Sequence, residues 1–227
     1  MNLAELRAEL EKDREWREQE IREFQNRGSI IADAEELKRY RRALVLLLYA
    51  HYEGFCKFAF TLYASAVNRE SLTCGEANYA IAAASLADVF KSLYNSQAKS
   101  DIFRNKAPDD SKLHRFARER EFIERVSEVE RRQVRIPDDV VDTESNLTAV
   151  VLRKNLFRLG LPHDQFDSYE SDISKLLGIR NGISHGELKD GVEEKTYSEL
   201  RSATASIMTH LSVGVMKALS RADYVRL

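Results

Sequence analysis

Glycine and proline are scarce in this chain. Its 227 residues include 9 glycines and 3 prolines, and long stretches contain neither. Because these residues interrupt regular structure, their scarcity favours long helices over many short strands joined by turns. Hydrophobic residues make up 43% and charged residues 32% of the chain, which is typical of a globular domain rather than a disordered one. The sequence therefore predicts an all-α fold.

Cysteine is also rare, with only Cys56 and Cys74. Two thiols cannot form a disulfide framework or supply the four ligands of a structural zinc site. The sequence lacks a glycine-rich phosphate loop, a zinc-protease helix, a Cys-X-X-Cys pair and the elbow motif of serine hydrolases. We therefore expect no metal and no cofactor.

The chain has no large excess of charge of either sign. Its formal net charge is −2, so it has no bulk attraction to phosphate. This argues against a protein that coats nucleic acid, but it is compatible with an enzyme that holds one phosphate at a time. A basic run at residues 38–42 could help to hold RNA, although such a run is more often a solvated helix end and Glu35 and Glu36 lie close by.

No uninterrupted apolar segment is long enough to suggest a membrane span. The most apolar stretch, residues 43–67, contains His51, Glu53 and Lys57 near its centre, which favours a buried core helix. The first residues are acidic and lack the apolar segment of a signal peptide. We expect a cytoplasmic protein with no membrane contact.

Apolar spacing and capping residues predict a single helical domain over residues 1–227. Asn2 with Glu5 has the spacing of a capping box, and Asp33 with Glu36 marks a second helix start. The expected helices cover residues 2–28, 33–68, 77–94, 111–134, 143–159, 168–185 and 197–220. The helix within residues 1–28 is heavily charged, and the polar segment 95–142 is a possible insertion into a helical bundle.

The residues best suited to chemistry lie near residue 180. An apolar helical stripe runs directly into Arg180, Asn181, Ser184 and His185. Asn181 and His185 are four residues apart on one helical face, so the amide could orient the imidazole. Arg180 and His185 are five residues apart, about 140° around an ideal helix, and a long arginine side chain or a bend at Gly182 could bring both to one phosphate.

These residue types suit RNA cleavage without a metal. In that reaction the RNA's own 2′-OH attacks the adjacent phosphorus. Histidine can transfer protons near neutral pH, and arginine supplies a permanent positive charge for the developing phosphorane. One histidine cannot easily act as base and acid at once, whereas a symmetric dimer supplies two.

Two segments resemble the HEPN superfamily. Residues 180–185, Arg-Asn-Gly-Ile-Ser-His, match its R-x4-6-H signature, including the asparagine after the arginine. Residues 51–55, His-Tyr-Glu-Gly-Phe, look like the H-x-E-G-F helix of the MAE-type branch, which occurs among toxin–antitoxin and defence proteins. The resemblance spans roughly residues 35–220 and implies an up-and-down helical bundle with additional helices. It also implies a homodimer that cleaves RNA without a metal. An antitoxin or other inhibitory protein is the expected partner that inhibits this activity.

The resemblance also implies a role for each residue of the motif. Arg180 would bind phosphate, Asn181 would have an orienting role in the site, and His185 would transfer protons. Ser184, His51, Glu53 and Lys57 could support these residues or contact the substrate. Glu187 stands where the branch paired with nucleotidyltransferase antitoxins usually has a tyrosine, which argues against regulation by modification at that position.

Several alternatives remain open from the sequence. Arg158 and His163 also match R-x4-H, but Pro162 interrupts that segment and no asparagine follows the arginine, so we discard it. Arg180 and His185 could instead be structural, with the histidine at a helix end. His51 could be a hydrogen-bonded core residue. The rival function is a non-catalytic helical module that dimerises or binds another protein.

Overall fold

The computed structural model describes residues 2–226, and within them every regular element is a helix, so the all-α prediction is confirmed. The α-helices are α1 (Leu3–Gly28), α2 (Ala34–Asn68), α3 (Tyr79–Ser85), α4 (Ala87–Tyr94), α5 (Ser111–Glu124), α6 (Val126–Arg131), α7 (Ala149–Arg158), α8 (Glu170–Ser184) and α9 (Glu194–Arg221). Two short 3-10 helices are η1 (Asp138–Val140) and η2 (Asp167–Tyr169).

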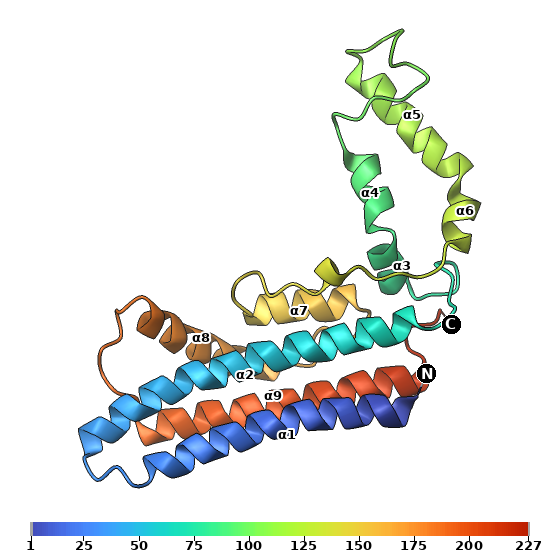
Figure 1. Cartoon of the computed structure of the whole chain (residues 1–227). Coiled ribbons are helices and arrows are strands. Elements are labelled where there is room, and N and C mark those ends of the chain that lie inside the picture. Colours follow the sequence, from blue (N-terminus) through green and yellow to red (C-terminus); the bar gives the residue numbers. More distant parts are fainter. Residues whose placement is uncertain (1, 227) are drawn as a thin grey trace.

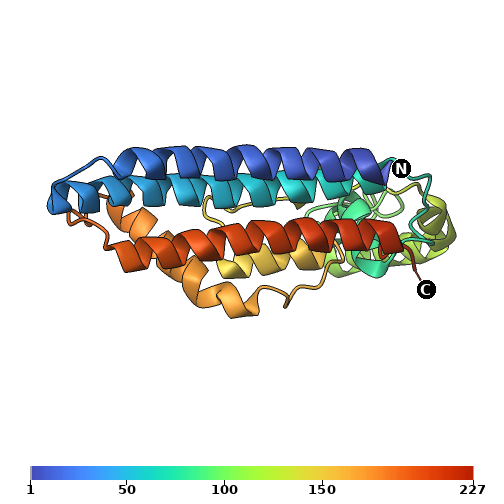
Figure 2. The ribbon, with the colours of Figure 1, turned by 90° about the horizontal axis from the view of Figure 1, so that it is seen from below.

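Three long helices, α1, α2 and α9, lie side by side and form the body of the molecule (Figures 1 and 2). α1 runs antiparallel to α2 and α9, and α8 packs against both α2 and α9. α7 lies along the same side of α2 as α8, and both chain ends lie at the same end of the bundle. The charged N-terminal helix is therefore part of the bundle.

Capping side chains begin the first two long helices as the sequence predicts. The Asn2 side-chain oxygen accepts hydrogen bonds from the backbone N–H groups of Ala4 and Glu5, at 3.2 and 3.3 Å. The Asp33 carboxylate accepts one from the backbone N–H of Glu36 at 2.6 Å. Each acceptor satisfies a donor that the first helical turn leaves unpaired.

α2 is the core helix. Large side chains are buried from Leu44 to Val67, among them Leu48, Tyr52, Phe55, Phe60 and Tyr63. By length and composition alone α2 could cross a membrane, but 56% of its most apolar 18-residue segment is buried within the protein. Packing against α1, α8 and α9 accounts for the apolar composition.

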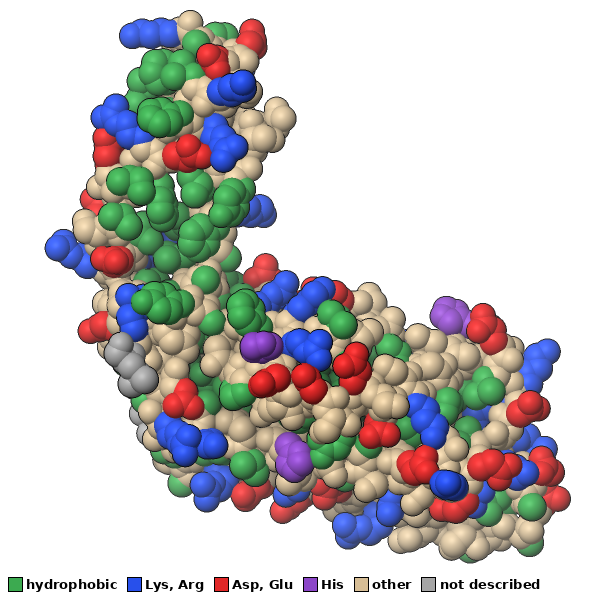
Figure 3. Space-filling model, turned by 180° about the vertical axis from the view of Figure 1, so that it is seen from behind, with side chains coloured by type: hydrophobic (Ala, Val, Ile, Leu, Met, Phe, Trp, Pro, Cys, Tyr) green, Lys and Arg blue, Asp and Glu red, His purple; other side chains and the backbone are tan. Residues whose placement is uncertain are grey.

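An arm formed by α4, α5 and α6 projects from one end of the bundle (Figure 1). Hydrophobic side chains gather along it (Figure 3), and Tyr94, Ile102, Phe116 and Ile123 are 60–78% exposed. The arm overlaps most of the segment 95–142 considered as an insertion, but residues 132–142 leave the arm and return to the bundle. The insertion itself stays a prediction.

Several predicted helix limits were wrong. The helix expected at 77–94 is divided at Leu86, and the helix expected at 111–134 is divided at Arg125 and ends at Arg131. α7 begins at Ala149 instead of residue 143, because the Thr148 side chain accepts a hydrogen bond from the backbone N–H of Val151 and caps the helix there. α9 begins three residues before the predicted start.

The loop between α8 and α9 is fixed to the start of α2 by the basic run. The Lys38 ammonium lies 2.9 Å from the Glu193 carboxylate and 3.0 Å from that of Glu35. The Arg42 guanidinium donates to the backbone carbonyl of Lys189, and Arg41 pairs with Glu194. These contacts favour an anchoring role for residues 38–42 over the RNA contact considered from the sequence.

Gly191 allows this loop to approach α2 closely. The backbone N–H of Val192 donates to the carbonyl of Lys38 at 2.9 Å, and a Cβ atom at residue 191 would lie 2.2 Å from the Lys38 Cβ. Real atoms cannot approach so closely, so a larger residue must push the loop away.

We predict that Gly191→Ala lowers the free energy of unfolding by about 1–3 kcal/mol, the usual cost of forcing atoms into a packed contact. Gly178→Ala is the matched control, because a Cβ there meets nothing within 4 Å and alanine stabilises a helix by about 0.5–1 kcal/mol over glycine. Urea unfolding measures both. Equal stability of the two variants would contradict the close approach.

Candidate active site

The C-terminal end of α8 has a defined geometry. His185 is the C-cap residue, and Gly186 follows in the left-handed conformation at φ +74°. The backbone N–H of Glu187 donates to the carbonyl of Gly182 at 2.8 Å, and that of Gly186 to Ile183 at 3.1 Å. This is a Schellman motif, which glycine stabilises because it alone adopts a positive φ without strain.

Arg180 lies between α8 and α2, with its guanidinium held from several directions. Nη1 donates to the side-chain oxygen of Asn146 at 2.9 Å and to that of Asn181 at 2.8 Å. The guanidinium carbon lies 4.7 Å from the centre of the Tyr49 ring, a cation–π contact. Both hydrogen bonds come from Nη1. The Arg180 Nε and Nη2 atoms form no hydrogen bond within residues 2–226.

Tyr49 connects this arginine to the loop that precedes α7. Its hydroxyl accepts a hydrogen bond from the backbone N–H of Leu147 at 2.9 Å, and both residues are buried. Asn146 is the neighbouring loop residue, so the same contact fixes the amide that binds Arg180. α2, α8 and the loop therefore meet at one guanidinium.

The loop itself is held by a buried asparagine. The Asn155 side chain accepts from the backbone N–H of Asp142 at 3.1 Å and donates to its carbonyl at 2.7 Å. Glu144 and Ser145 have positive φ angles of 49° and 68°, a conformation that residues other than glycine rarely adopt. A strained turn is thus kept in place directly before Asn146.

His185 and Ser184 lie at the surface beyond this cluster. Both are exposed, and His185 marks the last turn of α8, five positions after Arg180. No hydrogen bond within residues 2–226 joins the side chains of Asn181 and His185; the Asn181 oxygen binds Arg180 instead. In this chain, therefore, Asn181 binds the arginine, and the imidazole is exposed to solvent.

Glu53 lies one helical turn after Tyr49 and faces the same cluster. The pKa of Tyr49 is raised above its usual value, mainly because the ring is buried. The Glu53 carboxylate raises this pKa further, whereas the hydrogen bond from Leu147 and the Arg180 cation oppose the shift. Tyr49 is thus a neutral phenol between a cation and an anion. Glu53, four residues after Tyr49, is the acidic residue whose charge acts on this ring.

A family model supplies the link to known proteins. It describes the RiboL-PSP-HEPN family and matches residues 12–219 of this chain. The chain belongs to the RiboL-PSP-HEPN family. No curated protein and no solved structure matches it. The HEPN resemblance is confirmed by this match, whereas the MAE-type branch stays a prediction.

In this RiboL-PSP-HEPN chain, the H-x-E-G-F residues do not form one group. His51 is buried between α1 and α2, where its ring meets Trp16 edge-on with centroids 5.3 Å apart and its Nε2 lies 2.9 Å from the Glu20 carboxylate. Gly54 also faces α1, beside Arg17. The structure therefore buries His51 away from the Arg180 cluster, while Glu53 faces the cluster and Lys57 is exposed.

Tyr49 and Asn146 are parts of the site that the sequence alone did not reveal. Tyr49 lies two residues before the H-x-E-G-F segment, on the helical face that includes Glu53, and this spacing could have indicated it. Asn146 lies in a loop 34 residues before Arg180 and carries no local signal. Among residues 2–226, no group of three or more histidine, cysteine or acidic side chains is placed to hold a metal ion.

The buried His51 predicts a pH dependence of stability. Burial lowers the pKa of His51 below its usual value, with the Glu20 carboxylate opposing this and Arg17 adding to it. A depressed folded-state pKa means that the unfolded chain binds the proton first as the pH falls through about 6.5. We expect the free energy of unfolding to fall as the pH is lowered from about 7.5 to about 5.5.

Urea unfolding across this pH range tests the prediction in wild type, His51→Gln and the exposed control His210→Gln. The His51→Gln variant should have a flatter profile than the other two proteins. A profile as steep as that of wild type would show that His51 does not cause the dependence.

Proposed function

We propose that this RiboL-PSP-HEPN protein is a metal-independent endoribonuclease that acts as a homodimer. The observation that carries the proposal is the Arg180 guanidinium, which Asn146, Asn181 and Tyr49 hold near the end of α8, five residues before the exposed His185. A fixed arginine with unused donors suits a phosphodiester, because its planar fork matches two phosphate oxygens.

The proposed step is an internal transesterification of RNA. The 2′-oxygen of one nucleotide attacks the adjacent phosphorus, and its proton passes to a neutral imidazole. The bond from phosphorus to the 5′-oxygen of the next nucleotide breaks, and that oxygen takes a proton from an imidazolium. One product ends in a 2′,3′-cyclic phosphate and the other begins with a 5′-hydroxyl. Arg180 stabilises the negative charge of the phosphorane that forms before the bond to the 5′-oxygen breaks.

A second subunit would complete this chemistry. On an ideal helix Arg180 and His185 point about 140° apart and are separated by about 7.5 Å along the axis. Two-fold symmetry would bring a second histidine to the same phosphate, so that one imidazole accepts a proton while the other donates one. The expected setting is a cytoplasmic toxin or anti-phage enzyme whose activity an antitoxin or other inhibitory protein controls.

The second candidate is a non-catalytic HEPN module for dimerisation or protein binding. It is favoured by the same guanidinium, because the contacts of Arg180 with Asn146, Asn181 and Tyr49 lie within one chain and also join α8 to α2. In that case Arg180 would stabilise the fold. Its substitution would lower the free energy of unfolding, and the wild-type protein would have no ribonuclease activity to lose.

RNA cleavage in EDTA distinguishes the two candidates. We predict cleavage by wild type, a loss of about 10²–10⁴-fold in His185→Ala, and a loss of about 10²–10³-fold in Arg180→Ala. The matched controls are Arg158→Ala and His163→Ala, which change the discarded R-x4-H segment and should keep full activity.

Each variant must first be shown to be folded under the assay conditions, so that a loss of activity is not a loss of structure. Cleavage that persists in both site variants would reject this site. A purified wild-type protein that is folded and dimeric but cleaves no RNA would favour the non-catalytic module.

Mixing subunits tests whether the site needs two chains. We predict that wild type mixed with a large excess of the Arg180→Ala, His185→Ala double variant loses most of its activity, because nearly every wild-type subunit then has an inactive partner. The same excess of the Arg158→Ala, His163→Ala double variant should leave the activity unchanged. Activity proportional to the wild-type subunits in both mixtures would indicate a site within one chain.

A further inference from the structure

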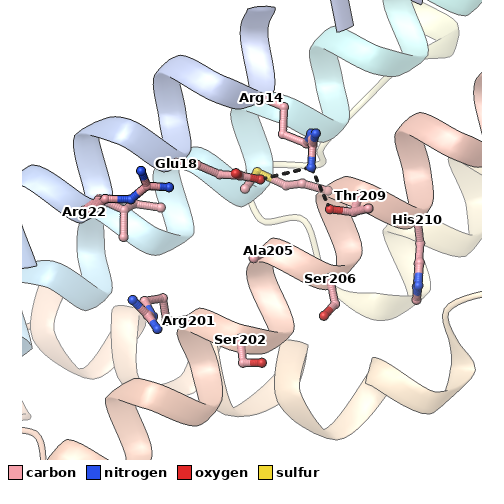
Figure 4. Close-up of a pocket in the computed structure, with 11 residues that line it drawn as sticks. Arg14, Glu18, Arg22, Arg201, Ser202, Ala205, Ser206, Thr209 and His210 are labelled. Atoms are coloured by element: carbon pink, nitrogen blue, oxygen red, sulfur yellow. Dashed lines mark hydrogen bonds and ion pairs between the residues drawn. The ribbon is translucent and has the colours of Figure 1, made fainter. Parts of the chain in front are cut away.

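A polar pocket lies between α1 and α9, separate from the Arg180 cluster. Its volume is about 490 Å³, within the usual range of small-ligand sites, which is roughly 300–1,000 Å³. Residues of α1 and α9 line it, and Arg180, Asn181 and His185 do not. Figure 4 shows the side chains that surround the space.

Small side chains on α9 create the hollow. On α9 the pocket is lined by Ser202, Ala205 and Ser206, whose side chains are short and leave space beside the helix. Ile21 and the buried Met208 supply an apolar floor. The pocket thus combines an apolar surface with hydroxyl groups that can donate hydrogen bonds.

Three arginines surround this space, with one carboxylate among the lining residues. Arg14, Arg22 and Arg201 carry positive charges, and Glu18 is the acidic partner. The formal balance of +2 contrasts with the net charge of −2 for the whole chain. The arginines therefore form a local positive site in a chain whose net charge is negative.

The single carboxylate is already engaged at one end of the pocket. Arg14 Nη1 donates to Glu18 at 3.3 Å and to the Thr209 hydroxyl at 3.0 Å, while its buried Nε has no hydrogen-bond partner. Arg22 is exposed and makes no ion pair within residues 2–226, and Arg201 donates to the neutral Gln25 side chain. Thus neither Arg22 nor Arg201 forms an ion pair within residues 2–226.

Arg22 and Arg201 lie across from one another at the same end of the pocket, on α1 and α9, away from Arg14 (Figure 4). A guanidinium fork binds carboxylate or phosphate oxygens in pairs. A carboxylate has two oxygens and one charge, so a single carboxylate satisfies one fork. A phosphate monoester has three terminal oxygens and about two charges, and it can accept bonds from both arginines at once.

We propose that this pocket binds a small phosphorylated molecule, with its phosphate between Arg22 and Arg201 and its remaining part over Ile21, Ala205 and Met208. Ser202 and Ser206 also line the pocket and carry hydroxyl groups. This site goes beyond the proposed ribonuclease activity and does not depend on it.

Isothermal titration calorimetry of the full chain tests the proposal with pyrophosphate and ribose 5-phosphate as probes. We expect saturable binding of one ligand per chain, weaker at high salt. Arg22→Gln and Arg201→Gln should each weaken binding about tenfold, the effect of losing one charged hydrogen bond. The control Lys12→Gln removes one charge from an exposed position of α1 outside the pocket and should leave affinity unchanged.

Two further arms separate this site from others. Arg180→Ala should retain the binding, whereas loss of binding in that variant would assign the ligand to the Arg180 cluster and overturn the proposal. Citrate should bind more weakly than pyrophosphate. Equal affinity for citrate, binding by a single-stranded oligonucleotide alone, or no saturable binding to the wild type would each overturn the proposed phosphate site.

Discussion

One guanidinium joins three parts of this protein. Arg180 on α8 donates to Asn146 in the loop before α7 and to its neighbour Asn181, and it lies over the ring of Tyr49 on α2. Arginine stays charged at every physiological pH, so its partners must supply oxygen acceptors and an aromatic face. The positive charge is thereby held at a fixed place with donors to spare, which is the arrangement that electrostatic catalysis requires.

The helical repeat of α2 explains why this position is available. Tyr49 and Glu53 are one turn apart and face the arginine, whereas His51 and Gly54 face α1, beside Trp16 and Arg17. The segment from Tyr49 to Gly54 thus serves two different purposes on two faces of the same helix. Its histidine belongs to the packing of the bundle, and its glutamate belongs to the surroundings of the proposed site.

The sequence predicted the features that depend on local chemistry. The caps at Asn2 and Asp33, the buried helix α2 and the end of α8 near His185 follow from side chains within a few residues of each feature. The divisions at Leu86 and Arg125 were missed because neither position carries glycine or proline. Asn146 was missed because its role depends on a contact across 34 residues, which no spacing rule describes.

In the proposed reaction the RNA supplies its own nucleophile at the Arg180 site. The most direct measurement is product analysis by phosphorus NMR, in EDTA, of an oligonucleotide cleaved by the wild-type protein, beside the same oligonucleotide with 2′-deoxyribose throughout. We expect a 2′,3′-cyclic phosphate from the ribose strand and no cleavage of the deoxyribose strand. Cleavage of both strands, or products that end only in a 5′-phosphate, would contradict the proposed reaction.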